Sequence, residues 1–177
     1  MTDTAAADGI TIAEARTPDD IAAVRSLCWA YRDFLIGLSE RDRQITETFY
    51  PVPRYRALMA DLPRLHAPPA GTMLLARDAE GTALGCGMTH ALAPDTAEIK
   101  RVFIAEAARG KGVARRLCQR LIEAARAAGH TRVVLDTSTS LGPAQALYTS
   151  LGFAPRGPYQ PIPADVLPHL LFYELSL

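Results

Sequence analysis

Cysteine is scarce in this sequence, and the few cysteines lie far apart. The three that occur among 177 residues, Cys28, Cys86 and Cys118, form no Cys-x-x-Cys pair and are odd in number. This pattern argues against a disulfide framework and against a zinc site. We therefore expect the cysteines to be small buried residues and expect no bound metal.

Net charge is also absent, because 19 basic residues balance 19 acidic ones. A chain without excess positive charge has no general electrostatic attraction for nucleic acid or for an anionic membrane surface. Neither is therefore an expected partner. Basic side chains do concentrate locally, between Lys100 and Arg120, and this concentration predicts one small anionic ligand.

Long apolar runs and a targeting segment are missing as well. No run approaches the length of a membrane span, and Met1–Asp8 is short, polar and acidic, unlike a secretory signal. The expected location is the cytoplasm. With 49% hydrophobic and 21% charged residues, residues 1–177 are expected to form a single globular domain.

Hydrophobic periodicity divides the chain into strands and helices. Alternating or continuous apolar runs predict strands at residues 10–16, 72–77, 82–92, 97–104, 131–137, 153–156 and 170–175. Gly85 and Gly87, inside the third run, predict a bulge or a close backbone approach. Apolar residues at three- and four-residue spacing predict helices at residues 18–38, 113–128 and 142–151, with two shorter helices within 40–65, interrupted at Pro51, Pro53 and Pro63.

The links between these elements predict the fold class. Hairpin-sized turns make the strands at 72–77, 82–92 and 97–104 antiparallel, and the strand–helix–strand crossover makes the strands at 97–104 and 131–137 parallel. The fold class expected is therefore α/β, with a mixed sheet of about seven strands and about four helices.

A glycine-rich loop, Arg109–Ala114, joins a strand to the start of an amphipathic helix. Its glycines allow a tight turn, and the helix N-terminus supplies unpaired N–H groups and a positive dipole end. Arg115 and Arg116 lie in the first turn, where cations oppose the dipole unless an anion offsets them. The loop therefore predicts a phosphate site; a glycine turn before a solvated surface helix is the alternative.

Four features stand in a fixed order: the strand Glu98–Ile104, the loop, the amphipathic helix and the segment Ala144–Phe153. With an Arg-x-x-Gly-x-Ala loop and an Ala-x-x-Leu-Tyr-x-x-x-Gly-Phe helix, this order resembles the GNAT superfamily of acyl-CoA-dependent N-acetyltransferases. The resemblance is specific over residues 97–153 and looser elsewhere. It implies the GNAT acyltransferase fold, with acetyl-CoA as cosubstrate.

The resemblance also implies where the coenzyme binds. In this superfamily the backbone amides of the loop hold the diphosphate, a role that falls here to Gly110, Lys111, Gly112, Val113, Ala114 and Arg115, with Arg109 orienting the turn. Pantetheine would lie along the strand edge that Val102, Phe103 and Ile104 form. Backbone N–H groups at Val102 or Ile104 would also bind the acetyl oxygen.

Two catalytic residues follow from the same resemblance. Tyr148 occupies the position from which related enzymes protonate the departing thiolate, and a phenol is a workable donor to a thiolate. Glu98 occupies the position of a general base, and strand alternation would place it on one face with Lys100, Val102 and Ile104. Because a free glutamate is a poor base for an ammonium, Glu98 would need burial or a water relay. An ordinary ion pair with Lys100 is the equal alternative.

Substrate contacts are expected from Tyr31, Tyr159 and either Lys100 or Arg101. Tyr31 lies on an apolar helix stripe, so a core position is its alternative. Lys100 and Arg101 suggest an acceptor amine that carries a carboxylate, but strand residues alternate, so at most one would face the site. The four histidines are expected to be surface or core residues: His66, His90, His130 and His169.

The expected function is acetyl transfer from acetyl-CoA to the primary amine of a small molecule, by direct attack and without a metal. An amino acid is one candidate acceptor. Three alternatives stay open: a CoA-binding regulatory protein without turnover, acetylation of a protein or peptide amine, and an unrelated nucleotide- or phosphate-binding domain. A second copy of the chain, in a homodimer, is the one further partner considered.

Overall fold

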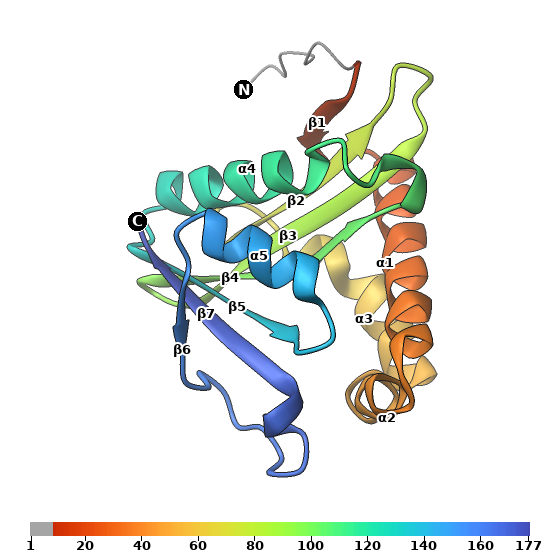
Figure 1. Cartoon of the computed structure of the whole chain (residues 1–177). Helices are drawn as coiled ribbons and strands as arrows, with labels where there is room; N and C mark the ends of the chain where they lie inside the picture. Colours follow the sequence, from red (N-terminus) through yellow and green to blue (C-terminus); the bar gives the residue numbers. More distant parts are fainter. Residues whose placement is uncertain (1–8) are drawn as a thin grey trace.

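The computed structural model describes residues 9–177 (Figure 1), and Met1–Asp8, where a secretory signal was sought, lies outside this range. Seven strands form one sheet: β1 (Thr11–Glu14), β2 (Gly71–Arg77), β3 (Ala83–Ala93), β4 (Thr96–Ile104), β5 (Arg132–Ser138), β6 (Ala154–Arg156) and β7 (Leu170–Ser176). The α-helices are α1 (Pro18–Leu38), α2 (Glu40–Phe49), α3 (Val52–Leu65), α4 (Val113–Ala127) and α5 (Gly142–Ser150). Two 3-10 turns complete the described elements, η1 (Glu106–Ala108) and η2 (Leu167–His169).

The strand order in the sheet is β1-β2-β3-β4-β5-β7-β6. Strands β1 to β4 are antiparallel, β4 and β5 are parallel, and β5, β7 and β6 are again antiparallel. The predicted mixed sheet is therefore confirmed. The expected number of about four helices is corrected to five within residues 9–177, because the two short segments on either side of Pro51 are both complete α-helices.

Helix boundaries follow local chemistry, with one exception at Pro63. Thr17 and Asp20 form a reciprocal capping box at the start of α1. The expected interruption at Pro63 is wrong, because α3 continues through it to Leu65. Proline cannot donate to the carbonyl four residues earlier, but Arg25 Nε donates to that carbonyl, Met59 O, at 2.8 Å. The arginine supplies the hydrogen bond that proline removes.

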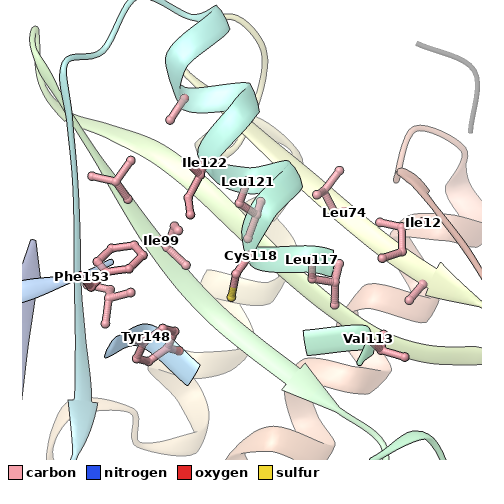
Figure 2. Packing of buried hydrophobic residues seen from close by; sticks show 14 of the residues in the cluster. Ile12, Leu74, Ile99, Val113, Leu117, Cys118, Leu121, Ile122, Tyr148 and Phe153 are labelled. Atoms are coloured by element: carbon pink, nitrogen blue, oxygen red, sulfur yellow. The ribbon is translucent and has the colours of Figure 1, made fainter. Parts of the chain in front are cut away.

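Two apolar layers enclose the sheet. Helix α4 packs Leu117 and Leu121 onto one face against Leu74 and Ile99 (Figure 2). Helices α1 and α3 pack their apolar side chains onto the opposite face, and the core there includes Phe103. Each fully buried leucine of this kind contributes about 1.5–3 kcal/mol. The three cysteines are buried free thiols, as expected.

The sheet forks between β4 and β5. These strands pair through only three residue pairs, the last being Glu98 with Val134. Beyond that point β4 continues beside β3, while β5 continues beside β7 (Figure 1). The edge of β4 that faces β5 is therefore open from Lys100 to Ile104.

A β-bulge lies on β4 within the fork. Arg101 and Val102 together lie opposite the single residue Gly87 of β3, and Arg101 has a φ of 53°. A Cβ atom on Gly87 would lie 2.9 Å from the Leu121 side chain, so a larger residue there would force the Leu121 side chain to move. The bulge that the glycines predicted is confirmed.

The bulge reverses which face each following side chain occupies. Val102 and Ile104 pack on the α4 side of the sheet, whereas Phe103 packs on the α1 side. Glu98 and Lys100, which precede the bulge, lie on the α1 side. The expectation that Glu98, Lys100, Val102 and Ile104 share one face is therefore wrong, because simple alternation fails at an inserted residue.

Candidate active site

One cavity of about 850 Å³ runs from the start of α4, through the fork, to the space beneath α1 and α2. Most of the predicted site residues line it: Tyr31, Lys100, Arg101, Val102, Phe103, Ile104, Arg109, Gly110, Gly112, Val113, Ala114, Arg115 and Tyr148. Three predicted residues do not line it, namely Glu98, Lys111 and Tyr159. The fold thus gathers the coenzyme, catalytic and substrate candidates around one space.

The end of the cavity at α4 is suited to an anion. Gly110 and Gly112 have φ values of 77° and 73°, the left-handed region that glycine adopts readily. Gly112 caps α4 without a side-chain hydrogen bond, and the first turn holds no acidic residue. The unpaired N–H groups of this turn therefore lie beside two cationic side chains, Arg109 of the loop and Arg115 of the first turn of α4.

The two arginines of this loop are held by nonionic contacts. The Arg115 guanidinium donates to Ser150 Oγ at 2.6 Å, and the Arg109 guanidinium lies over the Phe34 ring, 4.9 Å from its centroid. Within residues 9–177 neither forms an ion pair with a carboxylate. Lys111 is exposed and does not line the cavity.

Tyr148 lies at the fork, on the α4 side. Its side chain is nearly buried and contacts the rings of Phe153 and Tyr173. Burial, with smaller contributions from the neighbouring Cys118, Tyr31 and Asp136, raises the pKa of this phenol well above its usual value. The hydroxyl has no hydrogen-bond partner among the described residues, so it is a protonated donor facing the cavity.

Glu98 lies behind the cavity wall, on the α1 side. Its carboxylate accepts hydrogen bonds from Lys100 Nζ at 2.7 Å and from the Tyr159 hydroxyl at 2.7 Å, and His90 Nε2 lies 3.1 Å away. Burial alone would raise its pKa, but the hydrogen bonds from His90 and Lys100 and the charge of Lys100 lower the pKa to about 2. Glu98 is therefore an ionised carboxylate, and both of its oxygens have a polar partner.

This pairing with Lys100 is the alternative that the sequence left open for Glu98. Tyr159 donates from the loop before β7 and also lies 3.0 Å from Asp136 Oδ1, which faces the cavity from β5. His66 packs edge-on against His90 on the far side of this network. Burial lowers the pKa of His66 to about 4, so the ring is neutral near pH 7.

Beneath α1 and α2 the cavity is lined by aromatic rings and two further arginines. Arg32 donates through Nε to Tyr50 O at 2.9 Å and lies over the Tyr55 ring. Arg101 lies over the Tyr50 ring, and its Nε atom is buried without a hydrogen-bond partner. In the described part of the chain neither arginine has an ion-pair partner.

Lys100 and Arg101 both line the cavity. The expectation that at most one of them faces the site is therefore wrong. The cause is the bulge, because the positive φ of Arg101 turns its side chain toward the same space as Lys100.

Asp42 fastens α2 over this end of the cavity. Its carboxylate accepts hydrogen bonds from Ser39 and Ser138 at 2.6 Å each and from Ser140 at 2.7 Å. Burial raises its pKa, but the three hydroxyl donors outweigh burial and lower the pKa overall. Ser138 ends β5 and Ser140 precedes α5, so one carboxylate joins three segments.

Sequence reasoning missed four residues of this site: Arg32, Asp42, His90 and Asp136. A signal existed for Asp136, a lone acidic residue in the apolar strand next to β4. For His90 the hairpin register was the available signal, but an extra residue at Leu92 shifts the count so that His90 pairs with Glu98. Arg32 and Asp42 carry no local signal, because their partners are far away in the sequence.

Among residues 9–177, no group of three or more His, Cys, Asp or Glu side chains gathers in a way that could hold a metal ion. No helix in this range is long and apolar enough to cross a membrane.

Comparison with known proteins identifies the family. The acetyltransferase (GNAT) family matches residues 36–153. IAA acetyltransferase of Azospirillum brasilense is 40% identical over 144 residues, covering 79% of this chain and 88% of that protein. N-acetylaspartate synthetase of Rattus norvegicus is 33% identical over 100 residues, covering 56% of this chain but only 33% of that protein.

A solved acetyltransferase structure from Streptococcus agalactiae has a TM-score of 0.73 at 18% identity, covering 96% of this chain and 99% of that one, and shares the fold. The chain belongs to the GNAT family of acetyltransferases. It is an acyl-CoA-dependent N-acetyltransferase, and acetyl-CoA is its acyl donor.

Proposed function

We propose that this enzyme transfers the acetyl group of acetyl-CoA to the primary amine of a small molecule that also carries a carboxylate. The observation that carries the proposal is the single cavity, which joins an anion-binding loop to a chamber with two arginines that have no acidic partner in residues 9–177. The amine attacks the thioester directly, without a covalent enzyme intermediate.

The α4 end of the cavity fits the diphosphate of the coenzyme. Backbone N–H groups from Gly110 to Arg115 and the positive helix end would hold it. The open edge of β4 then accommodates the pantetheine arm beside Val102 and Ile104. A backbone N–H there would stabilise the developing oxyanion by about 3 kcal/mol.

Tyr148 is the proposed acid for the departing thiolate. Its hydroxyl faces the cavity without another partner in the described residues, and its raised pKa keeps it protonated near pH 7. A thiolate, whose conjugate acid has a pKa near about 8.5, can take a proton from such a donor when the two are in contact.

Glu98 contributes to deprotonation without touching the amine. Its side chain is only 3% exposed, and both of its oxygens are already engaged by residues of this chain. We propose that it acts through its bonded neighbours, including Tyr159, and not as a base in direct contact with substrate.

Arg101 and Arg32 supply the site for the acceptor carboxylate. A partly buried guanidinium without an anion is unfavourable, and arginine matches a carboxylate in both charge and shape. Arg101 is also held at a positive φ, a strained conformation of the kind found at ligand sites. N-acetylaspartate synthetase, a relative over part of this chain, is named for an acetylated amino acid.

The Arg101→Met variant tests this substrate class. A screen of amino acids, polyamines, aminoglycosides and peptide N-termini first identifies the best acceptor, which is then compared with its carboxamide. The variant should lose about 30-fold in kcat/KM on the acid, equivalent to about 2 kcal/mol for one charged hydrogen bond, and much less on the carboxamide. The matched control is Arg126→Met, at an exposed position on α4.

A parent enzyme that prefers the carboxamide, or an Arg101→Met variant that loses the same factor on both acceptors, contradicts the carboxylate assignment. Tight acetyl-CoA binding with no thiol released for any amine in the screen would instead favour a regulatory CoA-binding protein.

A further inference from the structure

We infer that Asp136 is the group that binds the acceptor ammonium and takes its proton, and that Glu98 is a positioning residue for Asp136. The inference rests on the proposed acetyl transfer and assigns to it a residue on β5. It is carried by the position of Asp136 at the fork, its access to the cavity and the hydroxyl that it shares with Glu98.

Asp136 lies where the two strands begin to separate. The last β4–β5 pair is Glu98 with Val134, and the next residues on the same face are Lys100 and Asp136. Their charged atoms remain 3.5 Å apart, Nζ to Oδ1. The carboxylate therefore lies at the closed end of the fork, beside the bulge where β4 first offers an open edge.

Access distinguishes Asp136 from Glu98. The Asp136 side chain is 26% exposed and lines the cavity, whereas that of Glu98 is 3% exposed and does not. Both known contacts of Asp136 use Oδ1, and Oδ2 has no hydrogen-bond partner within residues 9–177. An ammonium that enters the cavity can therefore reach a free carboxylate oxygen only on Asp136 of these two residues.

The hydroxyl of Tyr159 explains how the two carboxylates divide their roles. It lies 2.7 Å from Glu98 Oε1 and 3.0 Å from Asp136 Oδ1. Glu98, with its pKa near 2, stays ionised and accepts the shorter of the two hydrogen bonds. The longer hydrogen bond from Tyr159 ends on Asp136 Oδ1, so Asp136 Oδ2 stays available to the ammonium.

This arrangement holds the Asp136 carboxylate in place through Oδ1 and leaves Oδ2 free to accept a proton. Lys100, held by Glu98, fixes Asp136 from one side, and Tyr159, also held by Glu98, fixes it from another. Glu98 therefore acts on the reaction only through these two neighbours.

Two of the three ammonium protons leave the nitrogen during acetyl transfer. The ammonium transfers one proton to Asp136, and the nitrogen lone pair attacks the thioester carbonyl carbon, so that a C–N bond forms and the C–S bond breaks. Tyr148 gives its proton to the sulfur, and the second nitrogen proton returns Tyr148 to the phenol form. Asp136 then releases its proton to solvent, so that amide, thiol and one proton leave the enzyme.

The acid and the base approach from opposite sides of the fork. Tyr148 belongs to the apolar layer on the α4 side, whereas Asp136 faces the side of Lys100 and Glu98. They are close enough for the Asp136 charge to raise the pKa of Tyr148. Asp136 can therefore take the first proton of the ammonium from one side, while Tyr148 serves the thiolate and then the second nitrogen proton from the other.

The test compares Asp136→Asn with the parent on two acceptors of the same shape, one with an ordinary ammonium pKa and a fluorinated analogue whose amine is already neutral at the assay pH. Asp136→Asn should lower kcat/KM for the protonated acceptor by about 100-fold or more, the usual scale of a general base. For the neutral analogue the loss should be much smaller. Asp165→Asn, an exposed carboxylate, is the matched control.

An equal loss on both acceptors would show that Asp136 is merely structural, and no loss would exclude it from the reaction; either result overturns the inference while parent turnover upholds the proposed function. A parent that binds acetyl-CoA but acetylates no amine refutes both. If Asp136→Asn does not fold, Asp136→Ala removes the same carboxylate and should again lose much more rate on the protonated acceptor than on the neutral analogue. An equal loss in this variant would overturn the inference.

Discussion

Buried charge at single residues is what most distinguishes this site from an ordinary core. Glu98, Asp42 and Arg32 are each less than 8% exposed, and an isolated ion at such a position would be strongly unfavourable. The two carboxylates each have three polar partners, whereas Arg32 has a carbonyl and an aromatic ring. The arginine is thus the least neutralised of the three, which is why we assign it to an anionic substrate group.

The depressed pKa of Glu98 predicts an acid-dependent loss of stability. Its folded-state pKa is about 2, against 4.5 for the free side chain. The stabilisation is therefore fully present above pH 4.5 and is lost as the pH falls toward 2. Relative to the parent, Glu98→Gln should lose about 3 kcal/mol of unfolding free energy at pH 7.

Urea unfolding between pH 3 and pH 7 measures this difference, with Glu80→Gln, at an exposed turn, as the control. The gap between Glu98→Gln and the parent should narrow below about pH 4.5. A gap that is the same at every pH would show that the ionised carboxylate is not its source.

At the scale of elements, α2 is the part of the molecule most dependent on one side chain. Helix α2 has a polar sequence and only Asp42 and Thr46 among its buried residues. Two hydrogen bonds to Asp42, from Ser138 and Ser140, attach α2 across the cavity, and a third, from Ser39, lies at the N-cap of α2 itself. Elements of this kind open locally before the whole domain unfolds.

We expect Asp42→Asn to release α2. The neutral amide cannot accept from three hydroxyls as the carboxylate does, and the loss of charge-assisted hydrogen bonds should cost about 2 kcal/mol. Amide hydrogen exchange of residues 43–49 should accelerate in this variant, while exchange in α4 stays unchanged. Glu47→Gln, on the exposed side of the same helix, is the control; equal exchange in both variants would contradict the assignment.

Elements were predictable from the sequence where local chemistry decides them. The capping box at Thr17 and the glycines that end α4 and α5 depend on nearby residues, and these boundaries agree to within a few residues. The bulge of β4 was signalled by Gly87, but its position at Arg101 was not. That position depends on pairing with β3, and it decides that Lys100 and Arg101 face one cavity.

The sequence did not predict that helix α3 continues through Pro63, because this too depends on a residue far away in the chain. The donor that replaces its missing N–H is Arg25, on another helix. Asp42 was missed for the same reason, because its partners Ser138 and Ser140 lie on distant elements. The coenzyme end of the site lies within one continuous segment, whereas the acceptor end is assembled from five separate elements.

At the scale of the whole molecule, the fork is the feature on which we base the proposed acetyl transfer. Strands β4 and β5 separate after Glu98 and Val134, and this separation opens a passage between the two apolar layers. The core residues of both layers stay buried. The coenzyme loop lies at one end of that passage and the arginine-lined chamber at the other. Tyr148 lies between them, packed in one layer and facing the passage.

The central claim is that the thioester of acetyl-CoA lies in this fork, next to Tyr148. The most direct test is the Tyr148→Phe variant, which removes one oxygen atom, measured both for acetyl-CoA affinity by calorimetry and for kcat on the best acceptor. We predict that the Kd changes by less than about twofold while kcat falls by about 100-fold or more, as expected for a lost general acid. Equal kcat values for variant and parent would contradict the account.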